Sequence, residues 1–282
     1  NVVKGDVFNL SNNKFLDSYE AVINFILIKD ASIEENINYI KSLLAFCEAK
    51  KIKKFVHISS ISVYPNNAVK IDEFSEIEND YHNKSGYGAI KTAVDNYLEK
   101  NAPKDLDVVY VRPGYIYDDV SEISKVGIVK DLGPFSLLLG SKSSSLPAIH
   151  KDKLQDALVK ISSKSFPNTV FLILDKDKTK ATKYHFTKRQ WGKKLITVPE
   201  FPLFPAVKLL KKLKICPLSV SNKIEGLYKK TYFDSSLSEK ELEMDFGSRK
   251  FAVIGSGAYG SYISNLLSEK FPQDEIHIYE VG

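Results

Sequence analysis

Apolar segments alternate with amphipathic ones over the first part of the chain. Residues 20–28 (EAVINFILI) form an almost continuous apolar run, which is typical of a strand buried on both faces. Residues 33–50 follow with apolar side chains three or four positions apart, and this spacing predicts a helix. The segments 53–64 and 106–114 are again strand-like, and residues 86–103 between them predict a second helix. Alternating strands and helices imply crossover connections and a parallel sheet, so we expect an α/β, doubly wound, Rossmann-like fold.

The pattern is less regular after Gly114. Residues 170–175 (VFLILD) predict one more strand, and residues 232–246 predict a polar helix that closes the unit. Residues 204–215 predict a basic amphipathic helix, which is compatible with a membrane surface but more commonly caps a small domain. We therefore expect residues 115–246 to form most of a smaller α/β subdomain on the substrate side.

The strand pattern returns near the end of the chain, where residues 251–260 have the sequence FAVIGSGAYG. An apolar strand followed by Gly255, Gly257 and Gly260 has the Gly-x-Gly-x-x-Gly spacing of turns that bind a dinucleotide pyrophosphate. The segment EIHIYE then predicts a second strand that ends at Glu280, 20 residues after the last glycine. An acidic side chain there suits a ribose 2′-hydroxyl, so we predict that a second dinucleotide-binding domain begins here.

The composition is that of an ordinary globular protein, with 43% hydrophobic and 27% charged residues among 282. A net charge of +5, with lysines spread along the chain, does not favour a nucleic-acid partner. Cys47 and Cys216 lack metal-ligand spacing and the five histidines have no i,i+4 pairing, so we expect neither a disulfide framework nor a metal site. No apolar run of 18 residues and no secretory signal is visible, and we expect a cytoplasmic protein without a membrane span.

The segment YGAIK places Tyr87 and Lys91 four residues apart, on one face of the predicted helix. A phenol has an ordinary pKa of about 10, and a neighbouring ammonium lowers it. Such a pair can act as a general acid/base on a hydroxyl group. The spacing alone is weak, because Tyr184 and Lys188 show it too, in a stretch without a supporting pattern.

The context favours the first pair. A buried strand ends in Ser59 and Ser60, 27 residues before Tyr87, and the helix begins near that tyrosine. Ligands bind beyond the carboxyl ends of parallel strands, so these groups should meet there. The Ser60 hydroxyl would then bond the substrate oxygen and the tyrosine; the alternative is that the serines bond only the backbone of their own turn.

The segments FVHISSISVY, YGAIK and VRPGYIY resemble the extended short-chain dehydrogenase/reductase family, the NAD-dependent epimerase/dehydratases of sugar nucleotides. The resemblance extends over about residues 2–246. It implies a catalytic trio in which Tyr87 is the acid/base and Lys91 lowers its pKa and holds the nicotinamide ribose. Ser60 then orients the substrate hydroxyl.

The same resemblance implies the remaining contacts with NAD or NADP. The segment GDVFN matches the family's third strand and places Asp6 and Val7 beside the adenine. The segment RPG matches the loop beside the nicotinamide, which includes Pro113. Asn36 matches a helix asparagine that is often part of the proton relay.

Two departures from the family pattern change the expectation. Family dehydratases carry an Asp-Glu pair just after the catalytic serine or threonine, where this chain has Ile61 and Ser62. Dehydration is therefore disfavoured, and epimerisation or simple oxidation and reduction remain. The family's first βαβ portion, with its Gly-x-x-Gly-x-x-Gly turn, is not seen before Asn1, so we expect a fragment that lacks it.

The terminal segment resembles the N-terminal ADP-binding unit of flavin-dependent oxidoreductases, which implies FAD as a second cofactor. We divide the chain into a partial dehydrogenase/reductase domain, residues 1–247, and the start of a second domain, residues 248–282. A circular permutation is the alternative, although the glycine spacing argues against it. We further predict that FAVIG docks beside AVINFI, because the first domain would otherwise have an open sheet edge.

The favoured function is an NAD(P)-dependent epimerase or reductase of a nucleotide sugar. The alternatives are a non-catalytic binding module and a fragment whose function belongs to a fused flavoenzyme. We expect a nucleotide-sugar-like small molecule as the partner. The family is compatible with a homodimer, but the sequence leaves the oligomeric state open.

Overall fold

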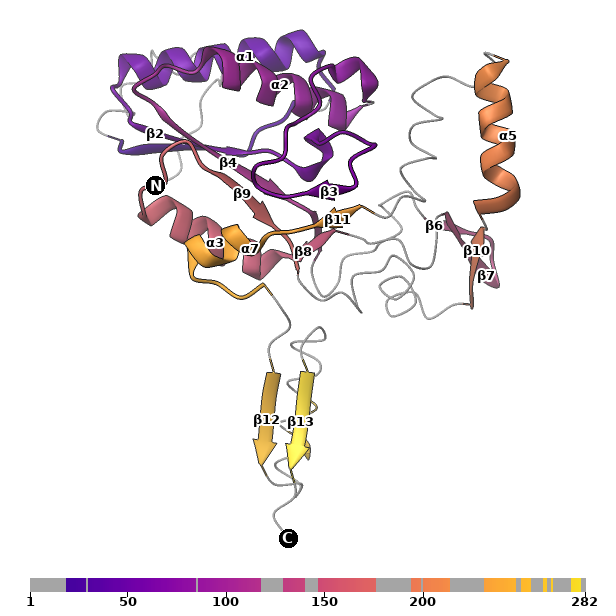
Figure 1. The fold of residues 1–282 in the computed structure, drawn as a ribbon. Coiled ribbons are helices and arrows are strands. Elements are labelled where there is room, and N and C mark those ends of the chain that lie inside the picture. Colours follow the sequence, from indigo (N-terminus) through magenta and orange to yellow (C-terminus); the bar gives the residue numbers. More distant parts are fainter. Residues whose placement is uncertain are drawn as a thin grey trace.

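The computed structural model describes residues 19–28, 30–84, 86–117, 129–139, 147–175, 194–198, 200–213, 231–246, 250–254, 261–262, 265 and 275–279. A four-stranded sheet forms the centre of the molecule (Figure 1). Its strands are β1 (Ala21–Asn24), β2 (Lys54–Ile58), β4 (Asp107–Pro113) and β9 (Val170–Ile173), in that spatial order. All three pairings are parallel, which confirms the predicted sheet.

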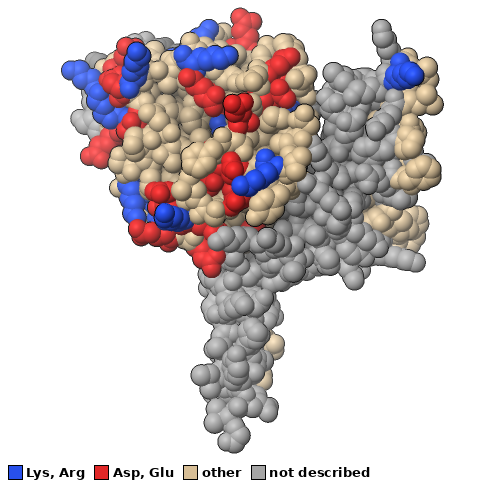
Figure 2. Space-filling model, in the orientation of Figure 1, with Lys and Arg blue, Asp and Glu red and all other residues tan. Residues whose placement is uncertain are grey.

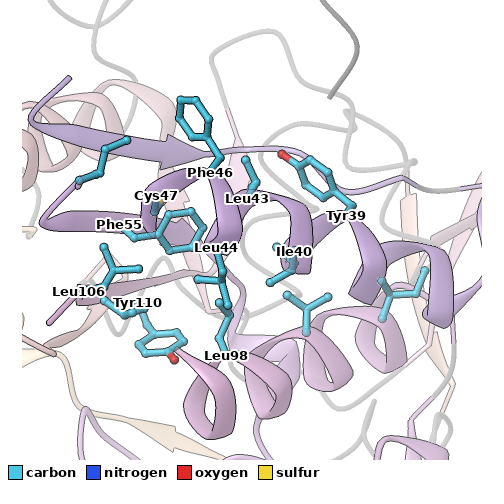
Figure 3. Close-up of a cluster of buried hydrophobic side chains, with 14 residues drawn as sticks. Tyr39, Ile40, Leu43, Leu44, Phe46, Cys47, Phe55, Leu98, Leu106 and Tyr110 are labelled. Atoms are coloured by element: carbon cyan, nitrogen blue, oxygen red, sulfur yellow. The ribbon is translucent and has the colours of Figure 1, made fainter. Parts of the chain in front are cut away.

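Helices cover both faces of this sheet, as expected for crossover connections. Helices α1 (Ile33–Ala49) and α2 (Tyr87–Asn101) lie on one face, and α3 (Lys151–Ser163) and α7 (Ser236–Leu242) lie on the other (Figure 1). Side chains alternate along β2 and β4, so each face has its own buried cluster. Figure 3 shows the α1–α2 side, and its labelled members are Tyr39, Ile40, Leu43, Leu44, Phe46, Cys47, Phe55, Leu98, Leu106 and Tyr110.

Local sequence explains where the first elements end. Ser32 begins α1 with a capping box, in which its hydroxyl accepts from the Glu35 amide and the Glu35 carboxylate accepts from the Ser32 amide. Strand β1 ends earlier than the apolar run because the Asn24 side chain accepts from the Ile26 amide at 3.0 Å, which forms a turn. The prediction of a strand buried on both faces is wrong here, since Ile23 is 39% exposed.

Short elements extend from the carboxyl edge of the sheet. β3 (Lys70–Ile71) pairs with β11 (Tyr232–Phe233), and β5 (Tyr115–Tyr117) pairs with β8 (Ala148–His150), both in parallel. A separate sheet contains β6 (Val129–Asp131), β7 (Phe135–Leu139) and β10 (Lys194–Val198). The pattern did not predict these strands, whereas the helix predicted at 204–215 is present as α5 (Glu200–Lys212), with a kink at Phe201.

Lysine and arginine side chains are interspersed with acidic ones on the face of the molecule in view (Figure 2). Within the described ranges, no helix combines the length and the apolar character that crossing a bilayer requires.

The terminal strands β12 (Lys250–Ile254) and β13 (Glu275–Tyr279) pair in parallel over five residues, with Val253 opposite Ile278 (Figure 1). Both strands were predicted, but the prediction that the first docks beside β1 is wrong. β12 lies in a separate sheet with β13, whereas the pairing of β1 within the described residues is with β2, where Ile23 lies opposite Val56. β12 and β13 are separated by far fewer residues than β12 and β1, and closing a shorter loop costs less conformational entropy.

Candidate functional site

A cavity of about 600 Å³ lies where the carboxyl ends of β1, β2 and β4 meet the start of α2. This is the edge at which ligands bind in open α/β sheets. The cavity has the size of a small-molecule site, with mainly apolar walls and a few polar groups. Its lining residues are Phe25, Leu27, Ile58, Ser59, Ser60, Ile61, Tyr87, Lys91, Pro113, Gly114, Tyr115, Ile116 and Pro147.

Ser60 reaches the cavity because β2 ends two residues before it. Its backbone is extended, and its hydroxyl accepts a hydrogen bond from the Ser62 amide at 3.1 Å, which begins a short 3₁₀-helix, Ile61–Val63. The hydroxyl also interacts with Tyr87. This serine therefore bonds its own turn and also faces the cavity.

Tyr87 and Lys91 occupy the first two turns of α2. The helix starts directly after Gly86, which has a positive φ of 52°. Tyr87 is 47% exposed at the cavity, whereas Lys91 is almost fully buried. The Lys91 ammonium lies 5.9 Å from the centre of the Tyr87 ring, and it donates a hydrogen bond to the Ile58 carbonyl at 2.5 Å.

Burial dominates the ionisation of both groups. Burial raises the pKa of Tyr87. The Ser60 hydroxyl opposes this effect, and the Asp95 carboxylate adds to it. Burial lowers the pKa of Lys91, and the Asp95 carboxylate opposes this effect. The expected lowering of the Tyr87 pKa is therefore not found in this arrangement, because desolvation outweighs it and the ammonium is bonded to the Ile58 carbonyl.

Pro113 lines the cavity as the last residue of β4, and Gly114 follows it. A Cβ atom at Gly114 would lie 2.3 Å from the Pro147 carbonyl oxygen and 2.6 Å from the Leu174 side chain. The close packing of this loop therefore requires a glycine, and it fixes the wall of the cavity next to Pro113.

A buried polar network lies beneath Lys91. The Asp95 carboxylate accepts the Ser59 hydroxyl at 2.8 Å and pairs with the Arg112 guanidinium at 3.2 Å. His57 Nε2 lies 3.3 Å from the same carboxylate, and all of these residues are buried. Burial raises the pKa of Asp95, whereas the interactions with His57 and Arg112 lower it. The net result is a pKa below the ordinary value.

The sequence interpretation did not single out Asp95, His57 or Arg112 as functional residues. The spacing contained a usable pattern, because Asp95 follows Lys91 by four residues and continues the face begun by Tyr87. A carboxylate on the buried face of a helix is rarely left unpaired, which would have predicted a cationic partner.

Asn36, which matches a proton-relay asparagine, has a structural role here. Its side chain accepts from the Ile28 amide and donates to the carbonyls of Ile28 and Ser32, each at 3.0 Å. It is not among the residues that line the cavity. These bonds hold the turn after β1 against the start of α1.

Six predicted cofactor residues lie outside the described residues, as does the second tyrosine–lysine pair at Tyr184 and Lys188. The structure thus brings together Ser60, Tyr87, Lys91 and Pro113 and describes none of the others. Those six residues are Asp6, Val7, Gly255, Gly257, Gly260 and Glu280.

Solved structures similar to this chain share its fold at low sequence identity. UDP-N-acetylglucosamine 4-epimerase from Bacillus cereus has a TM-score of 0.55 and 16% identity, over 85% of this chain and 76% of its own. dTDP-glucose 4,6-dehydratase from Bacillus anthracis str. Ames, in complex with NAD, has a TM-score of 0.56 and 14% identity, over 86% and 73%. MoeE5 in complex with UDP-glucuronic acid and NAD has a TM-score of 0.57 and 16% identity, over 86% and 79%.

A search of curated protein sequences finds no match to the chain. A family model does match its first part, over the strands and helices that carry Ser60, Tyr87, Lys91 and Pro113. The model is that of the NAD dependent epimerase/dehydratase family, and it matches residues 2–118.

Proposed function

We propose that this protein is an NAD(P)-dependent epimerase or reductase of a nucleotide sugar, with Tyr87 as the acid/base. One observation carries the proposal: Ser60, Tyr87, Lys91 and Pro113 come from three separate elements and line one cavity at the carboxyl edge of the sheet. The non-catalytic alternative requires no such convergence of a serine, a phenol and an ammonium.

The cavity fits the nicotinamide end of NAD or NADP. Its volume lies in the range of small-molecule sites, and Phe25, Leu27 and Pro113 give it apolar walls for a flat ring. Lys91 supplies the ammonium at the base of the cavity, where it would bond the ribose hydroxyls. When bound there, the nicotinamide accepts or supplies a hydride.

The residues of this chain then handle the proton. Ser60 orients the substrate hydroxyl towards Tyr87, whose phenolate form accepts its proton as the carbon gives up its hydride. In the reverse direction, the Tyr87 phenol donates that proton to a carbonyl oxygen. The raised pKa of Tyr87 favours the phenol, so the arrangement described here is the proton-donating one.

The residues after Ser60 favour redox chemistry over elimination of water. Ile61 lines the cavity and carries no ionisable group, and Ser62 cannot act as a carboxylic acid would. Dehydration needs a separate acid and base for the leaving water, and neither position provides one. We therefore propose epimerisation or simple reduction.

Cofactor binding and turnover of the full chain test this function. NAD and NADP are titrated by calorimetry, and turnover is followed with UDP-glucose, UDP-glucuronic acid, UDP-N-acetylglucosamine and dTDP-glucose. Nicotinamide absorbance detects net redox, and chromatography detects epimers. We expect NAD or NADP binding that Lys91→Ala weakens, with turnover of at least one sugar. Binding without any turnover would favour the non-catalytic module, and no binding would refute the proposal.

The parallel β12–β13 pair supports a second, separate candidate for residues 248–282. A dinucleotide-binding unit begins with two parallel strands joined through a glycine turn, and β12 and β13 have that pairing. We propose that this segment is the start of an FAD- or NAD-binding domain, distinct from residues 1–247. Titration with FAD of the full wild-type chain and of Gly257→Val tests this assignment. We expect binding that the substitution weakens, and binding that the substitution leaves unchanged would contradict the assignment.

A further inference from the structure

One buried carboxylate on α2 contacts residues at the ends of β2 and β4, close to the cavity. Asp95 lies on α2, four residues after Lys91 and eight after Tyr87, on the same face of the helix. Both of its oxygens lie 2.8 Å from the Ser59 hydroxyl, at the end of β2. On its other side, Arg112 Nε and Nη2 approach Asp95 Oδ2 at 3.3 and 3.2 Å from β4.

The contacted residues are direct neighbours of the cavity residues. Ser59 precedes Ser60 and Arg112 precedes Pro113 in the sequence. We propose that Asp95 is the positioning residue of the proton-transfer site, whose carboxylate fixes Ser60, Pro113 and the Tyr87–Lys91 pair relative to one another. The assignment of a proton-transfer site rests on the proposed function.

His57 extends this network to the end of β1. Asn24 Oδ1 accepts from the Ile26 amide at 3.0 Å and from the Tyr39 hydroxyl at 2.9 Å, so the Asn24 amide nitrogen is the atom that faces His57 Nδ1 at 3.2 Å. His57 Nδ1 therefore accepts, and the ring proton resides on Nε2, 3.3 Å from Asp95. Burial lowers the pKa of His57, which favours the neutral ring, and the bond from the Asn24 amide selects this tautomer.

Charged and titratable groups face Asp95 from three elements. Lys91 and Glu99 flank it on α2, Arg112 and Tyr110 face it from β4, and His57 faces it from β2. Arg112 also donates to the Tyr64 hydroxyl at 3.1 Å and to Glu99 at 3.3 Å, and its guanidinium lies between the rings of Tyr64 and Tyr110.

Because Asp95 is fully buried, its negative charge is poorly screened and acts on the groups one and two turns away. It raises the pKa of Lys91, against the effect of burial, and so favours the charged ammonium. It raises the pKa of Tyr87 as well. The carboxylate thus sets the position of the trio and also the protonation of two of its members.

Asp95→Asn tests the proposal with little change in size. The full chain is labelled with ¹³Cε-lysine, and the Lys91 signal is identified by its loss in Lys91→Arg. We expect the titration midpoint of Lys91 to move to lower pH in Asp95→Asn. Glu99→Gln is the matched control, because Glu99 also pairs with Arg112 but its side chain is 43% exposed, so that water screens its charge. The titration midpoint of Lys91 should stay unchanged in Glu99→Gln.

A double variant keeps the test decisive if Asp95→Asn does not fold. Asp95→Asn/Arg112→Met removes both charges, and the methionine fills part of the space of the arginine side chain with apolar atoms. Proteins often tolerate such replacement of a buried ion pair. The double variant should shift the midpoint of Lys91 in the same direction but by less, because the Arg112 cation, which disfavours the ammonium, is removed as well. An unchanged midpoint in the folded variants would overturn the proposal. Loss of folding in both would also do so, because it would make Asp95 a residue of the core only.

The pH–rate profile separates this proposal from the proposed function. Where turnover is found, both limbs of the Asp95→Asn profile should move to lower pH, since Asp95 raises the pKa of both Tyr87 and Lys91. A merely structural role would lower the rate without moving the limbs. The lysine titration needs no substrate, so a shifted midpoint without turnover would uphold Asp95 and refute only the enzyme assignment.

Discussion

The central sheet and the terminal β12–β13 pair contain similar local sequences in different surroundings. β2 and β12 are each five residues long and largely apolar, and small residues follow each of them in the sequence. β2 has β1 and β4 on its two sides and helices on both faces, whereas β12 pairs with β13. The local pattern predicted both strands, and in the part of the chain that the structure describes β2 has neighbours that bury polar side chains beside a cavity.

This difference separates two kinds of site. A glycine turn binds phosphate through its own backbone N–H groups, so its function is encoded in a few consecutive residues. The cavity at β2 depends on His57, Ser59, Asp95 and Arg112, which come from three elements and satisfy one another in the interior. A site of the second kind becomes visible only when the fold is known.

The largest expected effect falls on the central site. Tyr87→Phe removes only the hydroxyl that transfers the proton, so turnover should fall by about 10²- to 10⁴-fold with little loss of stability. Steady-state kinetics at several pH values measure it. Tyr184→Phe, in the other tyrosine–lysine pair, is the matched control and should be nearly silent. Turnover of Tyr87→Phe within about threefold of the wild type would refute the acid/base assignment.

The next effect concerns the stability of the same region. Arg112→Met leaves the Asp95 carboxylate buried without its guanidinium partner, which should lower the free energy of unfolding by about 3–5 kcal/mol. Urea denaturation measures this, and Asp95→Asn/Arg112→Met should recover part of the loss.

Val253→Ala in β12 tests the terminal pair, for comparison with Arg112→Met in the central sheet. The pairing of this strand is with β13, so we expect the main unfolding transition to be unchanged. An equal loss in Val253→Ala and Arg112→Met would mean that the two regions unfold as one unit.

A smaller, pH-dependent effect on stability is expected from Lys84, a buried lysine that precedes α2. Lys84 donates to the Tyr64 carbonyl and to Asn66 Oδ1, and burial lowers its pKa to about 8. The unfolded chain therefore binds more protons between pH 8 and 10.5, so stability rises with pH in that window. Relative to Lys84→Met, the wild type should gain about 2 kcal/mol by pH 10. A constant difference across this window would contradict the lowered pKa.

The sequence predicted the parts of this fold that depend on periodicity. The spacing of apolar residues located α1, α2 and the four strands of the sheet, because burial on one or two faces imposes that spacing. It did not predict the end of β1, which depends on a side chain–backbone bond at Asn24. The prediction that β12 docks beside β1 was wrong, since β12 lies in a separate sheet with β13. Ser60, Tyr87 and Lys91 were singled out by the strand end, the tyrosine–lysine spacing and the family resemblance, whereas Asp95 contacts residues that are distant in sequence.

The smallest expected effect is on the terminal glycines. A valine at Gly257 adds a branched side chain where a pyrophosphate would approach the backbone, so it blocks any dinucleotide site built on that turn. If the terminal segment is a unit of its own, Gly257→Val should leave NAD binding at the central cavity unchanged, while Lys91→Ala weakens it. Calorimetric titration of both variants and the wild type with NAD measures this. Loss of binding in both would mean that the two ends of the chain build one site, which would favour the permuted arrangement.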